Sequence, residues 1–245
     1  MQSADERTQS QARYDGPPIP DDITGKEADR YVTNQLKSLP EKLASRVARH
    51  LVAAARLLET DPETAYQHTV AARARAARVP VVREAGGEAA YAAGRFKDAL
   101  AELRAAQRMS HTSIYLPMMA DCERALGRPQ RALTLAREPG VQDLDEAGQI
   151  EMKIVESGAR RDLGETAAAV RVLEGRELRS HSRAPWVSRL RYAYAEALLA
   201  DGQPEAAREW FERAAGADSH GHTDAAERLV ELEGLLVIDT SDDEH

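Results

Sequence analysis

An alanine recurs five times along this chain, each time shortly after a turn, and consecutive copies are 34, 33, 37 and 38 residues apart. The recurring residues are Ala65, Ala99, Ala132, Ala169 and Ala207. In four copies a glycine stands five residues before the alanine, and the first copy has Thr60 at that position instead. Periods of this length are typical of stacked helical hairpins, in which each repeat buries its apolar face against its neighbours.

A second pattern lies twelve residues before each alanine, where every residue is small. These positions hold Ala53, Gly87, Ala120, Ser157 and Ala195. A small residue in each of two helices lets their backbones approach closely, so the paired positions predict five hairpins. The expected helix pairs are 40–59 with 62–78, 81–93 with 96–109, 112–126 with 129–137, 145–163 with 166–177, and 185–200 with 204–216.

The segments outside the hairpins have different compositions. Residues 1–22 are polar and proline-containing, so we expect a disordered N-terminal arm. Thr24 and Glu27 form a capping box that predicts an N-terminal capping helix over 23–39. We expect the repeat domain to span 40–234, including a C-terminal capping helix at 222–232, and an acidic tail to span 235–245.

Composition and charge restrict the class of protein. The single cysteine excludes an internal disulfide, and no run approaches the roughly 20 apolar residues of a membrane span. The N-terminus lacks the apolar run of a secretory signal, so we expect a cytoplasmic protein with no membrane partner. The net charge of −8 is unevenly distributed: residues 41–140 hold 16 basic and 11 acidic residues, and residues 141–245 hold 12 and 23.

The repeated residues resemble tetratricopeptide repeats (TPRs). The copy that matches best has Gly87, Gly94, Phe96, Ala99 and Ala106. No copy has the tryptophan near the start of the family pattern, and the third and fourth copies lack the late alanine. The strings at 19–25, 121–133 and 184–198 are also similar to uncharacterised actinobacterial TPR proteins. The resemblance implies an all-α fold, a right-handed α-solenoid of about five TPR-like hairpins with N- and C-terminal capping helices.

Proteins of this family usually bind peptides in the concave groove that their first helices line. Carried over by position, the resemblance implies groove residues at His50, Leu57, Glu84, Glu88, Tyr91, Asp121, Arg124, Glu151, Arg161, Arg189, Tyr192 and Glu196. The acids suit a basic or amphipathic segment, and the arginines suit a carboxylate. A solvated charged face with packing tyrosines is the equally weighted alternative. Gripping of acidic chaperone C-termini is not supported, because His50, Ala54 and Ala85 occupy the matching places.

A basic strip in the N-terminal half offers a second function. It comprises Arg73, Arg75, Arg78, Arg83, Arg104 and Arg108. Arginines can contact RNA phosphates, so an RNA- or ribosome-associated accessory factor is the alternative function. Aromatic stacking partners are missing, however, and arginines spaced this way on a helix point in different directions. A solvated or ion-paired helix is therefore the favoured interpretation of the strip.

The sequence offers no catalytic constellation. It has no nucleophile paired with a base and no glycine-rich phosphate loop. His220 and His222 are close, but they lack the further ligands of a metal site. We therefore expect a non-enzymatic scaffold or adaptor without cofactor or metal, whose partner is a protein or peptide.

Overall fold

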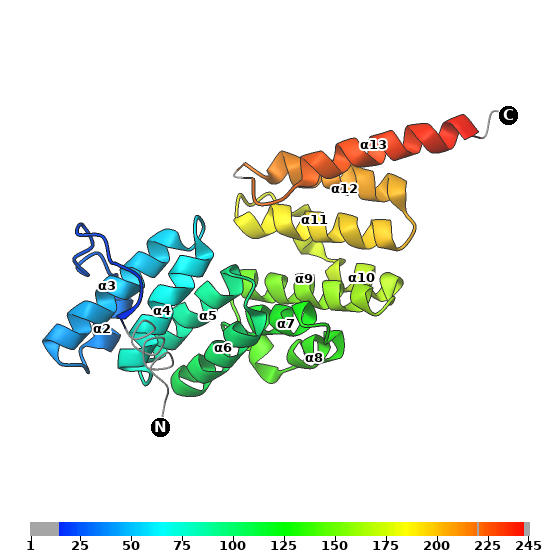
Figure 1. Cartoon of the computed structure of the whole chain (residues 1–245). Helices are drawn as coiled ribbons and strands as arrows, with labels where there is room; N and C mark the ends of the chain where they lie inside the picture. The colour runs from blue at the N-terminus through cyan, green and yellow to red at the C-terminus, as the bar shows by residue number, and fades with distance from the viewer. Residues whose placement is uncertain (1–14, 220, 243–245) are drawn as a thin grey trace, which may run out of the picture. The chain divides into compact units, whose positions relative to one another are not determined.

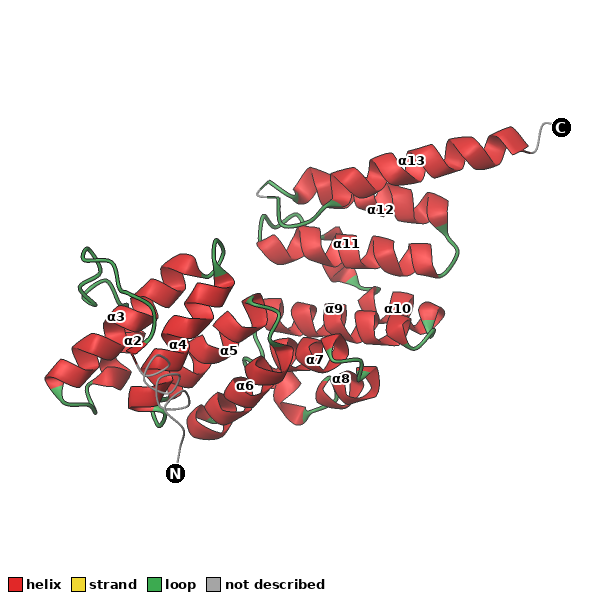
Figure 2. Ribbon diagram, in the orientation of Figure 1, coloured by secondary structure: helices red, strands yellow, loops and turns green. Residues whose placement is uncertain are grey.

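The computed structural model describes residues 15–219 and 221–242, and every regular element in these ranges is helical (Figures 1 and 2). The α-helices are α2 (Arg30–Leu36), α3 (Glu41–Leu57), α4 (Pro62–Ala76), α5 (Pro80–Ala92), α6 (Phe96–Ser110), α7 (Leu116–Ala125), α8 (Pro129–Leu135), α9 (Glu146–Asp162), α10 (Thr166–Leu173), α11 (Pro185–Ala200), α12 (Pro204–Ala217) and α13 (Ala225–Asp242). Two 3₁₀ helices, η1 (Pro139–Asp143) and η2 (Arg176–Arg179), follow α8 and α10. The expected all-α class is confirmed.

The chain divides into two compact units, one ending at Leu126 and the other beginning at Gly127. The first unit holds α2 to α7 and the second holds α8 to α13. The boundary therefore falls inside the third expected helix pair, between 112–126 and 129–137.

The turn residues explain where the helices within a pair begin and end. Pro62 and Pro204 occupy the first turns of α4 and α12, where their missing N–H groups would have no intrahelical acceptor. Gly94 and Gly202 follow α5 and α11 with φ of 69° and 76°, a left-handed conformation that glycine adopts without strain. The helix bounds in these pairs lie within a few residues of those predicted.

The recurring small residues lie in the core of each unit. All five alanines are 0 % exposed, and the five residues twelve positions earlier are also buried. Ser157 donates a hydrogen bond to the carbonyl of Ala169 (3.0 Å), the partner that the spacing predicts. At Gly87, however, a Cβ would lie only 2.4 Å from Cδ2 of Leu103, so the nearest neighbour is the large residue four positions after Ala99.

This close contact gives a prediction for two glycines that both lie in helices. Gly87→Ala is expected to lower the free energy of unfolding by about 1–2 kcal/mol, because displacing the buried Leu103 outweighs the gain in helix propensity. Gly216→Ala in α12 has no atom within 4 Å of the new Cβ and is expected to raise it by up to about 1 kcal/mol. Urea unfolding measures both, and equal effects would contradict the packing at Gly87.

The N-terminal segment differs from its predicted structure. In the expected disordered arm, 1–22, the described residues 15–22 lie against α3 and α4, and the rest of the arm, 1–14, lies outside the described residues. Glu27 does accept a hydrogen bond from the Thr24 amide (3.1 Å), but Gly25 has φ of 87° and stops a helix from beginning there. Asp29 instead caps α2, so the capping helix is shorter than 23–39.

The C-terminal helix is longer than predicted. The sequence places a capping helix at 222–232 and a tail beyond 235, whereas α13 begins at Ala225 and continues to Asp242. The end of the tail, 243–245, lies outside the described residues. Asp218 holds the preceding turn by accepting hydrogen bonds from the amides of His222 (2.8 Å) and Thr223 (2.7 Å).

Candidate functional site

In the first unit, three of the expected groove residues contact one another. Tyr91 on α5 donates its hydroxyl proton to Asp121 Oδ2 on α7 (2.5 Å). Asp121 Oδ1 also accepts a hydrogen bond from Arg124 (2.9 Å), one turn further along α7. All three side chains are partly exposed, so α5 and α7 present a joined polar surface.

Glu84 does not lie on that exposed surface, in contrast to the expectation. It is 4 % exposed and accepts hydrogen bonds from Tyr31 Oη (2.9 and 3.0 Å) and Ser110 Oγ (3.1 Å). Its carboxylate therefore links α5 to α2 and α6. Burial and the charge of Glu84 raise the pKa of Glu88, which is only partly exposed.

His50 also differs from the expectation, because it is 1 % exposed and its Nδ1 lies 3.1 Å from Nδ1 of His68. The His50 ring therefore packs against His68 of α4. Leu57 packs against a small apolar cluster that includes Ala65 and Ala89. These two expected groove residues therefore contribute to packing.

In the second unit, ion pairs join the expected residues of consecutive first helices. Arg189 on α11 contacts Glu151 on α9 (2.7 Å), and Glu196 on α11 contacts Arg161 on α9 (3.0 Å). Tyr192 lies between these pairs in the sequence, and burial with a hydrogen bond to Asp224 raises its pKa. We call the polar residues on the first helices the first-helix face: Glu88, Tyr91, Asp121 and Arg124 in the first unit, and Glu151, Arg161, Arg189, Tyr192 and Glu196 in the second.

Carboxylates neutralise much of the basic strip. Arg73 and Arg83 both donate to Glu102, and Arg104 donates to Glu123 (2.7 Å). The side chain of Arg75 is 2 % exposed and donates to the backbone carbonyl of Ala71. Arg78 and Arg108 are exposed. Inward or paired arginines present little charge to a phosphate backbone, which weighs against a nucleic-acid surface here.

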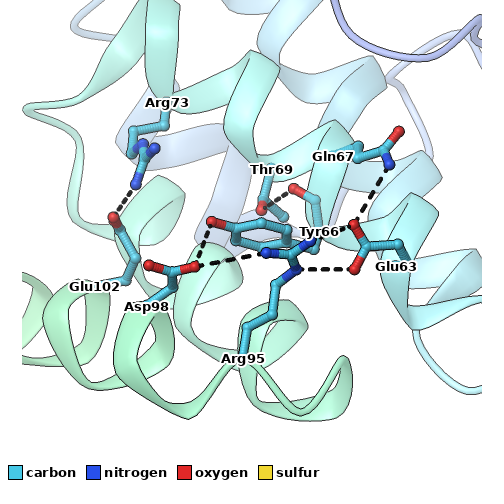
Figure 3. Close-up of polar contacts among 8 residues, drawn as sticks. All are labelled: Glu63, Tyr66, Gln67, Thr69, Arg73, Arg95, Asp98 and Glu102. Carbon is cyan, nitrogen blue, oxygen red and sulfur yellow. Dashed lines mark hydrogen bonds and ion pairs between the residues drawn. The ribbon is translucent and has the colours of Figure 1, made fainter. Parts of the chain in front are cut away.

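A polar cluster between α4 and α6 was not predicted from the sequence (Figure 3). Arg95 donates two hydrogen bonds to Glu63, each 2.8 Å long, and its guanidinium lies 4.9 Å from the centre of the Tyr66 ring. Tyr66 donates to Asp98 Oδ2 (3.2 Å). The hydrogen bonds from Arg95 lower the pKa of Glu63, and burial raises the pKa of Tyr66.

This cluster lines a cavity of about 650 Å³ together with Gly16 and Pro17 of the N-terminal segment. The charged groups of the cluster pair with each other, since Arg95 forms ion pairs with both Glu63 and Asp98. An arrangement in which each acid already has a cationic or hydroxyl partner positions α6 on α4 and offers no activated nucleophile or base. The spacing in the sequence is the feature from which this cluster could have been predicted. Glu63 and Arg95 are separated by close to one repeat, and so are Tyr66 and Asp98.

Two kinds of feature are absent from the described ranges, 15–219 and 221–242. Within them, no three His, Cys, Asp or Glu side chains are grouped to hold a metal ion. None of the helices there combines the length and the apolar character that crossing a membrane requires. His220, one of the two histidines that flank Gly221 and were considered for metal binding, lies outside the described residues.

Comparison of the chain with protein-family models, with curated proteins and with solved structures gives no significant match.

Proposed function

We propose that the chain is a right-handed α-solenoid of TPR-like hairpins with a capping helix at each end, acting as a non-enzymatic scaffold or adaptor. The repeated helix pairs and their turn residues support this architecture, as do the ten buried small positions at the expected spacing. Small residues at helix crossings are what close hairpin packing needs. With its single cysteine buried and free, the chain suits a reducing compartment, so we place it in the cytoplasm.

The proposed binding surface is the first-helix face, and its ligand is a protein or peptide segment. The observation that carries this proposal is the set of contacts between consecutive first helices, Tyr91 with Asp121 and Arg189 with Glu151. Tyr91 and Asp121 in the first unit, and Arg189 and Glu151 in the second, therefore lie next to each other on neighbouring first helices. Their mutual contacts also hold the side chains in place, which lowers the entropy lost on binding.

A three-residue variant tests this surface. We expect Glu88→Gln/Tyr91→Phe/Asp121→Asn to reduce capture of the specific protein partner by about tenfold or more, because two charges and a rigid hydroxyl are lost from the face. The measurement is affinity capture on the immobilised full chain, read by mass spectrometry, with a thermal unfolding scan to verify the fold.

The matched control is Arg78→Glu/Arg108→Glu, which alters the exposed arginines of the basic strip. Undiminished capture of every partner by the three-residue variant would contradict the proposed surface. Loss of binding in the arginine variant instead, with a steep dependence on salt, would favour the RNA- or ribosome-associated alternative.

A further inference from the structure

A second, basic cavity of about 530 Å³ lies between α3 and the N-terminal segment. The α3 residues that line it are Lys42, Ser45, Arg46, Arg49 and His50. Their spacing of three and four residues places them on one side of the helix. Lys42, Ser45 and Arg46 are exposed, so one wall of the cavity is open to a ligand.

The carboxylate of Asp15 lies at this site. Its Oδ1 is 3.6 Å from Arg46 Nη2 and 3.6 Å from Nη2 of Arg75, the inward-turned arginine of α4. Lys42 and Arg49 bring the local cations to four, and a cavity of this volume is much larger than one carboxylate requires.

His50 adds a polar atom in need of a partner. Its ring is 1 % exposed, and its Nε2 makes no hydrogen bond within the described part of the chain. A buried polar atom without a partner costs about 1–3 kcal/mol. The His50 ring is also among the groups that line the cavity.

Gly16 holds the N-terminal segment in this position. A Cβ at this residue would lie 2.5 Å from Cβ of Ala71 and 3.1 Å from Cε1 of His50, so the segment crosses α4 where only a glycine fits. Its φ of 71° is also in the left-handed region. Further along, Arg56 pairs with Asp22 (2.5 Å), and Arg49 donates to the carbonyl of Ile23 (2.7 Å).

We propose that the α3 side of this cavity is a receptor for an extended acidic peptide segment of a partner, and that residues 15–19 of the chain cover this receptor surface in cis. Asp15 supplies the carboxylate that a partner's acidic residue replaces, and the two prolines at 17 and 18 keep the occupant extended. The segment therefore acts as an autoinhibitory ligand. The site uses residues other than the first-helix face, so it is a second binding surface.

The test uses the full chain and a fluorescently labelled peptide that copies residues 15–22, Asp-Gly-Pro-Pro-Ile-Pro-Asp-Asp. Gly16→Ala displaces the cis segment without changing any cation of the cavity. Because a tethered occupant competes at an effective concentration in the millimolar range, we expect this variant to bind the peptide about tenfold more tightly than the unmodified chain in fluorescence anisotropy. Gly202→Ala is the matched control, since its φ is 76° but no atom lies within 4 Å of the new Cβ; it should bind as the unmodified chain does.

Two further variants identify the site. Gly16→Ala/Arg46→Glu should lose the peptide, whereas Gly16→Ala/Arg131→Glu, which changes an exposed arginine of α8, should retain it. A peptide with asparagine in place of its first aspartate should bind more weakly. Equal binding by Gly16→Ala and the unmodified chain, or retention in the Arg46→Glu variant, would overturn the proposal.

Inorganic phosphate at constant ionic strength distinguishes a simple oxyanion site from a peptide receptor. Displacement by phosphate as effective as that by unlabelled peptide would overturn the peptide assignment. The three-residue variant of the first-helix face should bind this peptide normally, so failure of one binding surface is measured separately from failure of the other.

Discussion

Replacement of Phe211 by alanine is expected to lower the free energy of unfolding of the second unit by about 4 kcal/mol. Among the described residues, Phe211 is the largest fully buried side chain, with 0 % exposure. It packs edge-on against Tyr192, with ring centres 5.4 Å apart, and lies in the cluster that contains Leu190, Ala195 and Ala207. Truncation leaves a cavity that rigid helices on both sides cannot fill, so the transfer and cavity contributions add.

The other phenylalanine of the chain, Phe96, is the control for this variant. Phe96, at the start of α6, is partly exposed and contacts Tyr91 edge-on, with ring centres 5.7 Å apart. We expect Phe96→Ala to cost only about 2 kcal/mol, because water already reaches part of the ring. Urea unfolding followed by circular dichroism measures both, and a Phe211→Ala effect no larger than that of Phe96→Ala would contradict the packing of the second unit.

The repeat spacing predicts the helices well because two local features, a proline at the helix start and a glycine at the preceding turn, mark the same boundaries. Pro204 at a helix start and Gly202 at the preceding turn both follow from backbone chemistry that needs no tertiary information. The capping box of Thr24 and Glu27 lies outside the repeats, and its prediction of a helix start there was wrong. Thr24 and Glu27 do bond to each other, yet Gly25 between them has a positive φ, and a tight turn forms instead of a helix.

The candidate sites were harder to predict, because spacing gives the register of a helix but not which side of it faces solvent. Position in the repeat predicts that His50 lies in the groove, whereas α3 turns it toward His68 on α4. Glu102 illustrates the same limit: it binds Arg73 and Arg83, which lie 29 and 19 residues earlier. Such partners are identified only once the helices pack.

We expect the free energy of unfolding to fall in acid because of the buried pair of His50 and His68. Their Nδ1 atoms are 3.1 Å apart, so one ring must donate and the other accept, and this contact requires at least one of the two rings to be neutral. Burial, with the nearby His68 and Arg75, lowers the pKa of His50 to about 4, and burial also lowers that of His68. Arg46 and Arg49 of α3 act in the same direction, and the carboxylate of Asp15 is the acid that faces this group of cations.

A histidine whose pKa is lowered on folding does not change the free energy of unfolding at pH values above its pKa in the unfolded chain, about 6.5. There the imidazole is neutral in both the folded and the unfolded chain. As the pH falls below that value, the unfolded chain binds a proton that the folded chain does not, so the free energy of unfolding decreases. For His50 the decrease between pH 7 and pH 5 is about 2 kcal/mol, and it continues toward pH 4.

The pH dependence is measured by urea unfolding between pH 5 and pH 7, a range above the ordinary titration of exposed carboxylates. His50→Asn/His68→Asn keeps polar side chains in the pair but removes its titration, so the slope over this range should flatten whatever the stability of the variant at pH 7. His181→Asn, in an exposed loop, should keep the slope of the unmodified chain. An unchanged slope in the double variant would contradict the prediction. It would show that titration of His50 and His68 does not cause the pH dependence of the free energy of unfolding.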